Sequence, residues 1–334
     1  MSTTIQDVAE RADVSVATVS RVLNESDRVR EETRETVVKA ARSLGYHPNE
    51  TARNLRAQET RMIGVLLPNM HGEFFAQVTR GLDERARASG HHLLVSNSHT
   101  QEDEAKTVIQ SLLGRVDGLI LLWPRLSHDF LDDLVPDDLP VVLLNTDRSG
   151  ARFETLAFDN HDGAYAAVEH LAEHGHERIA LLAGDPQNFD AQERRSGYRA
   201  AVDDHDLAAD PSLEIEGDFT REAGRDAVDQ LMALSPRPTA LFASNDSMAL
   251  GVLRGLRDAG LKAPDDLALV GFDDIPMAHY VAPSLTTVHA PMQELGERAM
   301  ERLLALVQEN AAPSHQTLNT RLVRRESCGC TSET

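Results

Sequence analysis

The chain has 334 residues, 41% of them hydrophobic, which is enough for a small domain and a larger two-part core. No stretch approaches a membrane span and the N-terminus lacks an apolar signal region, so we expect a cytoplasmic protein with no membrane partner. The net charge of −21 argues at first sight against a polyanionic partner. However, residues 1–60 carry nine Arg or Lys and ten Asp or Glu, so nearly all of the acidic excess lies after residue 60.

Residues 4–24 predict two short helices joined by a tight turn. Apolar residues recur at helical spacing in both halves, as Val8, Ala9 and Ala12 and then Val19, Val22 and Leu23. Ser15 stands where an N-cap belongs, because its hydroxyl can accept from a free backbone N–H. The second helix leaves a small face with one long cation, formed by Val16, Ala17, Thr18, Ser20 and Arg21. This pattern favours a helix-turn-helix that reads the major groove, and an amphipathic helix pair without DNA contact is the alternative.

Two further segments complete the predicted head. Residues 28–45 predict a third helix, because Val37, Val38, Ala41 and Leu44 recur at helical spacing and Gly45 can end it. Residues 46–56 then predict a short helix that Asn49 or its neighbours could cap. So short a helix is unstable alone in water and should form only when docked.

From Met62 onward, short apolar strands alternate with amphipathic helices. The predicted strands are 62–68, 92–97, 118–123, 140–145, 156–160, 178–184, 239–245 and 267–274. The predicted helices are 74–88, 102–113, 128–134, 163–173, 193–204, 221–234 and 247–259. Two βαβ series of this kind imply two doubly wound parallel sheets with a cleft between them.

Ligands of such sheets bind outside the carboxyl ends of the strands. Polar residues follow six of the predicted strands, in 69–75, 145–147, 159–160, 185–194, 245–246 and 273–274, with Phe75 and Phe219 nearby. Carboxylates and amides could bind sugar hydroxyls there while an aromatic ring covers the apolar face of a sugar. Each residue also has a structural alternative: Asp246 and Asp273 as helix N-caps, Arg194 in a surface ion pair, and both phenylalanines in the core.

The two cysteines, Cys328 and Cys330, lie two apart at the end of the chain and do not form a disulfide framework. We expect a solvated terminus here, with a metal or redox role as the alternative. No G-x-G-x-x-G follows the first strand, and we see no Ser/His/Asp order or metal-ligand spacing, so we expect no enzyme activity, cofactor or metal.

The stretch TIQDVAERADVSVATVSRVLN (4–24) closely resembles the N-terminal signature of the lactose/galactose repressor (LacI/GalR) family, and YHPNETARNLR (46–56) is similar to its hinge. The resemblance implies that two hinge helices pair in the minor groove, with Leu55 wedged into the central base step and Ala52 allowing close approach. Val16 and Ala17 match the pair that governs operator choice, and Arg21 remains to read a guanine. We therefore expect DNA contacts from Thr4, Ser15, Val16, Ala17, Thr18, Ser20, Arg21, Asn24, Asn49, Ala52 and Leu55.

The resemblance extends over the core, in segments such as ERRSGYRAA (193–201), FASND (242–246) and LVGFDD (269–274). It implies effector lobes similar to periplasmic sugar-binding proteins and an effector site formed by Phe75, Asn145, Arg194, Phe219, Asn245 and Asp273. Asn188 and Asp190 differ from the purine-reading residues of one member, which makes a purine less favoured than a sugar.

The resemblance implies an all-α DNA-binding head over residues 1–47, a hinge helix and linker over 48–60, and an α/β two-lobed core over 61–334. The N-lobe would be about 61–160 plus 291–320 and the C-lobe about 161–290 plus 321–330. It further implies a homodimeric repressor of carbohydrate-metabolism genes that binds a near-palindromic operator under the control of a sugar-like effector. A nucleobase, a nucleoside or a protein co-repressor is the alternative effector. A periplasmic sugar-binding protein would share the lobes but would need a signal peptide.

Overall fold

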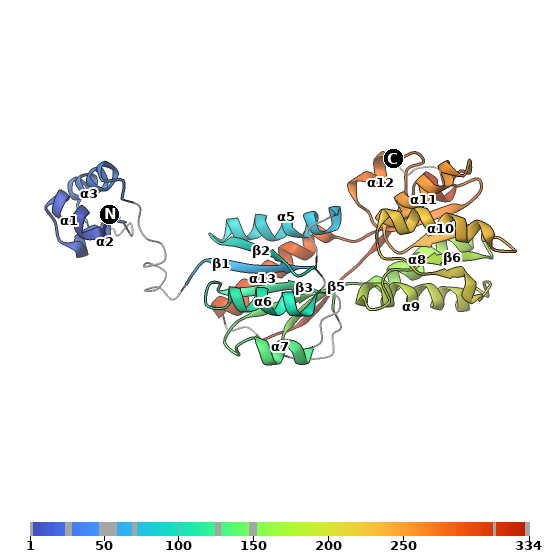
Figure 1. The fold of residues 1–334 in the computed structure, drawn as a ribbon, viewed down its shortest axis with the longest axis horizontal. Helices are drawn as coiled ribbons and strands as arrows, with labels where there is room; N and C mark the ends of the chain where they lie inside the picture. The colour runs from blue at the N-terminus through green and yellow to red at the C-terminus, as the bar shows by residue number, and fades with distance from the viewer. Residues whose placement is uncertain are drawn as a thin grey trace. The chain divides into compact units, whose positions relative to one another are not determined.

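The computed structural model describes residues 3–23, 29–46, 59–68, 72–99, 101–123, 128–146, 152–309 and 312–330. The chain divides into two compact units, Met1–Thr60 and Arg61–Thr334. Figure 1 shows the small unit as helical and the large unit as two α/β lobes. Within these ranges, no helix is long and apolar enough to cross a membrane.

The small unit consists of α1 (Ile5–Ala12), α2 (Val16–Leu23) and α3 (Glu31–Ser43) around a core that includes the fully buried Val8, Val19 and Val37. Thr4 caps α1 through a capping box with Asp7. Asp13 adopts a left-handed conformation (φ 53°) that ends α1 and starts the turn. The predicted pair of helices with a tight turn is confirmed. The helix predicted from residue 28 begins at Glu31 in the described residues.

The N-lobe contains a parallel sheet in the order β11-β5-β4-β3-β1-β2. Its strands are β1 (Met62–Leu67), β2 (His92–Asn97), β3 (Gly118–Leu122), β4 (Val141–Leu144), β5 (Glu154–Phe158) and β11 (His315–Leu318). The helices are α5 (Glu73–Ala88), α6 (Glu102–Leu112), α7 (His128–Leu134) and α13 (Met292–Glu309). Alternate residues of β1 enter two different cores, Val65 with Val78 of α5 and Leu66 with Ile109 of α6, so these helices cover opposite faces.

Helices α5 and α13 pack unusually closely in the N-lobe. A Cβ on Gly81 would lie 2.0 Å from the carbonyl oxygen of Gln293, and one on Gly296 would lie 2.2 Å from that of Val78. Both positions therefore require glycine because the two backbones touch there.

The C-lobe sheet has the order β12-β10-β9-β8-β6-β7, in which only the edge strand β12 is antiparallel to its neighbour. Its strands are β6 (Ile179–Leu182), β7 (Glu214–Ile215), β8 (Ala240–Ala243), β9 (Ala268–Asp273), β10 (Thr286–His289) and β12 (Arg321–Val323). The helices are α8 (Asn160–Glu173), α9 (Phe189–Asp204), α10 (Arg221–Ala233), α11 (Asp246–Asp258) and α12 (Pro276–Tyr280), with short 3-10 turns η1 (Pro211–Leu213) and η2 (Glu326–Cys328). Figure 1 shows α8 and α9 on one side of the sheet and α10 and α11 on the other.

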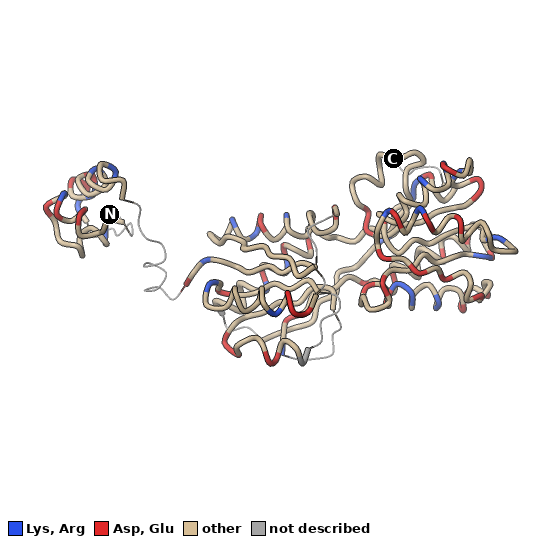
Figure 2. The backbone as a smooth tube through the Cα atoms, viewed as in Figure 1, with Lys and Arg blue, Asp and Glu red and all other residues tan. Residues whose placement is uncertain are grey.

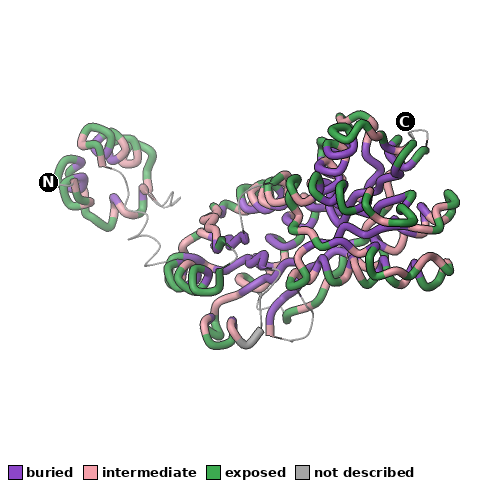
Figure 3. Tube along the Cα trace, turned by 45° about the vertical axis from the view of Figure 1, so that its right-hand side comes forward, coloured by how far each residue is buried: buried purple, intermediate pink, exposed green. Residues whose placement is uncertain are grey.

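The chain passes between the lobes three times, from β5 to α8, from β10 to α13 and from β11 to β12. Figure 3 shows the buried residues gathered in the interior of the large unit and the exposed residues over its outside. Figure 2 shows Asp and Glu distributed over both lobes. The predicted fold class, a helical head with two doubly wound parallel sheets, is confirmed.

Two helices of the C-lobe begin earlier than predicted. Helix α8 starts at Asn160, where the prediction began at 163, because Asp159 accepts a hydrogen bond from the Asp162 N–H and caps the helix there. Helix α9 starts at Phe189, where the prediction began at 193, because Asn188 caps it through the Ala191 N–H. Both early starts bring polar residues of the first turn into the interior.

Candidate functional site

The predicted DNA-reading face of α2 is exposed. Val16 is 41% exposed, and Ser15, Ala17 and Arg21 are also exposed. The Ser15 hydroxyl accepts from the Thr18 N–H at 3.2 Å, so the predicted N-cap is present. The start of α2 thus presents small side chains and a fixed backbone, which is the form a groove-reading helix requires.

Four of the predicted DNA contacts, Asn24, Asn49, Ala52 and Leu55, lie outside the described residues. The predicted hinge helix over 46–56 lies outside them as well, except for Tyr46.

Arg194 is the centre of a buried polar network in the large unit. It is 3% exposed, and its guanidinium carbon lies 3.7 Å from the centroid of the Phe272 ring. Its Nε donates to Oδ1 of Asn160 at 2.8 Å, and its Nη1 donates to the Ser244 carbonyl at 2.5 Å. The same Nη1 lies 3.5 Å from Oδ1 of Asp273. Several elements of the C-lobe therefore fix one cation against an aromatic face.

Asp190 extends this network into the N-lobe. It lies one helical turn before Arg194 on α9 and accepts from Nδ2 of Asn160 at 2.9 Å and from Nδ2 of Asn145 at 3.0 Å. Asn145 directly follows β4 of the N-lobe sheet and has a left-handed backbone (φ 51°). The network consequently joins the polar ends of strands from both lobes, where the topology rule places a ligand.

Burial controls the ionisation of the two carboxyls beside Arg194. Burial raises the pKa of Asp190 to about 6 and that of Asp273 to about 7, against the lowering effect of the Arg194 charge. Neighbouring Asp246 also has a pKa well above its usual range, because of its burial and then the charge of Asp273. The network can therefore both donate and accept protons in hydrogen bonds near neutral pH.

Two polar atoms of this region are buried without a hydrogen-bond partner in the described residues, Oδ1 of Asn145 and Oγ of Ser244. Buried polar atoms are nearly always satisfied in folded proteins. A ligand with hydroxyl or amide groups would satisfy them.

The remaining predicted effector residues lie at neighbouring positions. Asn245 caps α11 through the Met248 N–H, and its Nδ2 donates to the Phe219 carbonyl at 3.2 Å. Phe219 is partly buried, with a left-handed backbone (φ 67°), and a Cβ on Gly184 would lie 2.1 Å from its ring. Phe75, in the first turn of α5, contacts Phe74 edge-on and packs against the core. Among the described residues, no contact joins Phe75 to Arg194. Phe75 is therefore explained as well by packing in the core as by a role in the effector site.

Three structural alternatives are wrong. Arg194 is buried and not part of a surface pair. Asp273 ends β9 and contacts Arg194, so it is no helix cap. Asp246 lies inside the first turn of α11, where Asn245 is the cap, and it accepts from the Ile275 N–H at 2.9 Å and the Thr287 hydroxyl at 2.6 Å.

Asn160 and Asp190 fall within the predicted strand-end ranges 159–160 and 185–194 but were not among the six predicted effector residues, and Ser244 and Phe272 were in neither set. Asp190 and Arg194 are four residues apart, so they lie on the same face of α9 once its start at Phe189 is known. That spacing is a signal that places Asp190 beside Arg194. The contact of Phe272 depends on tertiary packing and had no local signal, whereas the position of Asn160 at a strand end was such a signal.

A separate hollow of about 470 Å³ lies elsewhere on the C-lobe, between α9, η1 and β7. It is lined by charged residues that pair with one another, such as Arg199 with Glu214 at 2.7 Å. It contains none of the predicted effector residues.

Two known families match parts of this chain. The family described as bacterial regulatory proteins, lacI family, matches residues 4–49, and the periplasmic binding protein-like domain matches residues 168–328. The HTH-type transcriptional repressor CytR of Escherichia coli (strain K12) is 36% identical over 326 residues, which cover 97% of this chain and 96% of that protein.

Solved structures agree in fold over nearly the whole chain. The lac repressor dimer bound to operator and the anti-inducer ONPF has a TM-score of 0.90 and 32% identity, covering 98% of this chain and 99% of that one. The complex of the transcriptional regulator CelR with cellobiose has a TM-score of 0.74 and 31% identity, covering 97% and 99%. All three similar proteins are named as regulators of transcription.

Proposed function

Because the chain belongs to the LacI family of bacterial regulatory proteins, we propose that this DNA-binding transcriptional repressor controls carbohydrate-metabolism genes through a sugar or sugar derivative bound at the Arg194 network. The observation that carries the proposal is the buried network that links Asn145, Asp190, Asn160 and Arg194 across the two lobes.

The exposed start of α2 supports the DNA-reading part of the proposal. Val16 and Ala17 can contact thymine methyl groups but cannot form bidentate hydrogen bonds to bases. Arg21, exposed one turn further along the same helix, can bond to O6 and N7 of a guanine. Because residues 1–60 carry nine Arg or Lys against ten Asp or Glu, the head has no net positive charge, and base contacts and DNA shape contribute more to its affinity than they do in a basic head.

The chemistry of the network supports a sugar. Arg194 and the amide groups can donate to hydroxyl oxygens, while Asp190 and Asp273 can accept from hydroxyl hydrogens. The unpartnered Oδ1 of Asn145 and Oγ of Ser244 provide two further positions for hydroxyl groups. The similar regulator CelR was solved with cellobiose, which is consistent with a carbohydrate.

We further propose a homodimer that binds a near-palindromic operator with one head per half-site, as the operator complex of the similar lac repressor dimer suggests. The hinge over 46–56, with Leu55 as the wedge, connects head and core in this proposal. The effector changes operator affinity only to the extent that it prefers one arrangement of the lobes over the other.

The test is a thermal-shift screen of the purified full-length protein against sugars, sugar phosphates, nucleobases and nucleosides. Each ligand that raises the melting temperature is then added to an operator-binding titration by fluorescence anisotropy. A sugar that stabilises the core and changes operator affinity supports the proposal. A nucleobase or nucleoside with both effects contradicts it, as does a protein that binds its operator but responds only to a partner protein.

A further inference from the structure

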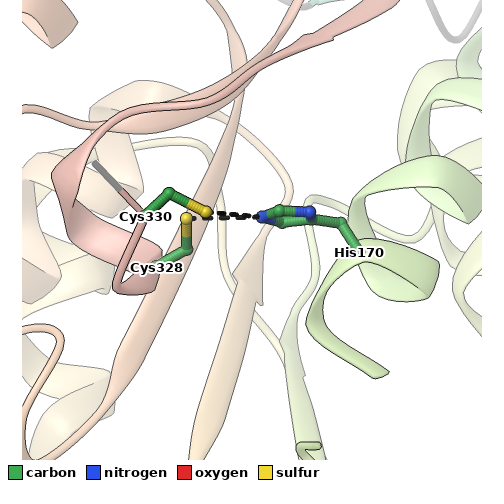
Figure 4. Close-up of side chains that lie close together, drawn as sticks. All are labelled: His170, Cys328 and Cys330. Carbon is green, nitrogen blue, oxygen red and sulfur yellow. Dashed lines mark hydrogen bonds between the residues drawn. The ribbon is translucent and has the colours of Figure 1, made fainter. Parts of the chain in front are cut away.

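The two cysteines near the end of the chain lie beside two histidines at the C-terminal end of α8, His170 in its last turn and His174 as its C-cap. Figure 4 shows His170 pointing from α8 toward Cys328 and Cys330 on the C-terminal segment. Nε2 of His170 lies 3.4 Å from Sγ of Cys328 and 3.6 Å from Sγ of Cys330, and Nε2 of His174 lies 3.3 Å from Sγ of Cys330. Cys328 is only 3% exposed, so the expectation of a solvated terminus is wrong for this residue.

The two histidines are arranged as ligands through Nε2. His170 lies in the last turn of α8 and His174 is the C-cap four residues later, so both rings project from the same side of the helix end, and their centroids are 4.3 Å apart. Nδ1 of His174 lies 2.7 Å from the carbonyl oxygen of His170 and donates to it, which leaves Nε2 with its lone pair. His170 is 2% exposed, so it approaches the sulfurs from the protein interior.

We propose that Cys328, Cys330, His170 and His174 form a binding site for a thiophilic metal ion of the zinc class. The ligand atoms of His170, Cys328 and Cys330 all lie within 4.8 Å of one another. His174 lies outside that group of three, but its Nε2 is 3.3 Å from Sγ of Cys330, so a shift of its ring would complete the set of four. A tetrahedral zinc ion with ordinary Zn–S and Zn–N bonds separates nitrogen from sulfur by about 3.6 Å. The three measured N···S distances, 3.3 to 3.6 Å, agree with that geometry.

The surroundings favour the deprotonated thiols that such a site needs. The hydroxyl of Thr286 lies 3.0 Å from Sγ of Cys328 and can donate to a thiolate there. Two thiolates and two neutral imidazoles balance the charge of Zn²⁺ and match the softness that selects it over Mg²⁺ or Ca²⁺.

A metal at this position would join segments far apart in sequence. The cysteines follow β12, more than 150 residues after His170, and the coordinate bonds would tie the chain's end to α8. Because the ligands come together only in the folded C-lobe, metal binding would stabilise the fold.

The experiment uses the full-length protein, purified with a reductant and stripped with a chelator, and titrates it with Zn²⁺ and with Co²⁺ as a spectroscopic probe. We expect about one ion per chain, Co²⁺ absorption with thiolate charge-transfer bands, and a melting temperature that rises with Zn²⁺. Cys330→Ser should weaken binding by more than about 100-fold and remove the charge-transfer intensity of one thiolate. His174→Gln should weaken it by about 10-fold or more.

His176→Gln is the matched control, because His176 lies just beyond α8 but its Nδ1 contacts the Thr239 hydroxyl instead of the sulfurs. It should leave metal affinity within about twofold of the parent. The proposal is overturned if the reduced protein binds neither ion tightly, or if Cys330→Ser binds as well as the parent. Unchanged binding in His174→Gln would overturn the four-ligand assignment. The site would also be excluded if the purified protein contains a Cys328–Cys330 disulfide and still binds no metal after that disulfide has been reduced.

Discussion

Nδ2 of Asn145 donates a 3.0 Å hydrogen bond to Oδ2 of Asp190, and this bond joins the end of a strand in one lobe to a helix of the other. Asp190 accepts from Asn160 with its second oxygen, and Asn160 in turn accepts from Arg194. Any ligand that inserts between these groups must replace bonds that now hold the lobes together. The network can thus convert ligand binding into a preference for one lobe arrangement.

Arg194→Ala should abolish the effector response and leave operator affinity near that of the ligand-free protein, because the contacts of the side chain lie in the buried network of the core. Effectors of allosteric proteins typically change affinity by 5–150-fold, and we expect less than about twofold in the variant. Operator titrations with and without effector measure this. Arg199→Ala, on the same helix with an exposed pair to Glu214, should respond like the parent. If Arg194→Ala does not fold, Arg194→Gln replaces it in the same titrations. A large loss of operator affinity in the absence of effector would contradict the assignment of Arg194 to the effector site.

Asp190→Asn should flatten the dependence of core stability on pH. The folded-state pKa of Asp190 is raised to about 6, so between pH 4 and 6 the folded state binds more protons than the unfolded state. Stability therefore falls as the pH rises through this range, by on the order of 2 kcal/mol from Asp190, and the variant lacks this contribution. Because the pKa of Asp273 is raised to about 7, the stability of the Asp190→Asn variant should still fall somewhat as the pH rises. Urea unfolding from pH 4.5 to 7.5 gives the slopes.

Asp210→Asn is the control for that experiment. The Arg178 guanidinium and Ser212 hold the pKa of Asp210 at about 2, below its unfolded value. Its stabilising contribution is complete above pH 4 and is lost only at lower pH, so the slope between pH 4.5 and 7.5 should match that of the parent. An Asp190→Asn profile as steep as the parent's would show that Asp190 does not titrate in this window.

Arg21→Ala should weaken binding to the preferred operator by about 1–3 kcal/mol and relax the preference at one base pair. Arg21 is exposed on the last turn of α2, on the face that carries Val16 and Ala17. Arg11→Ala, on α1, should change specific binding much less. Competition titrations with operators substituted at each position distinguish the two, and equal losses on operator and random duplex would exclude a base contact.

Leu55→Ala should weaken specific binding far more than non-specific binding, if Leu55 enters the central base step of the operator. Leu55 lies outside the described residues, so this prediction rests on the family resemblance alone. Affinities for operator and for random duplex at one salt concentration provide the measurement. Equal losses on both would rule out the wedge.

Arg302→Ala should destabilise the large unit by about 3–5 kcal/mol, because it leaves a buried carboxylate without its partner. Glu154 is fully buried, and both of its oxygens accept from Arg302, at 2.8 and 3.0 Å. Arg298→Ala removes an exposed i,i+4 pair with Glu294 from the same helix and should cost less than about 0.5 kcal/mol. Chemical unfolding of the three proteins measures both effects. A cost below 1 kcal/mol for Arg302→Ala would mean that Ser314 alone satisfies Glu154.

The sequence predicts most of the fold because its signals are local. The apolar runs at 62–67 and 179–182 become buried strands, and the residues near Ser15 form the capped start of α2. The last part of the core was harder to predict from the sequence. Four of its elements were not predicted, namely β10, α13, β11 and β12. The strands among them are only three or four residues long, and the chain changes lobe between β10 and α13 and between β11 and β12, so the pairing of these strands depends on tertiary structure.

The predicted effector site shows the same division. Strand-end polarity identified Asn145, Arg194 and Asp273, and the structure brings Arg194 and Asp273 into contact and links Asn145 to them through Asp190. Strand-end polarity also included Asn160, but its bond to Arg194 and the contact of Phe272 with Arg194 were not predicted, because both join segments more than 30 residues apart. The burial of Cys328 was missed for the same reason: its contact with His170 spans 158 residues.

The three crossings between the lobes constrain how the core can move. If one lobe rotates, the backbone torsions of all three crossings, near residues 159, 290 and 319, have to change together. One rigid crossing would be enough to block the rotation. A substitution that stiffens one crossing should therefore restrict the rotation of the lobes. It would shift the equilibrium between lobe arrangements without contacting ligand or DNA. These short connectors are thus natural places to retune the sensitivity of such a protein while its binding chemistry stays unaltered.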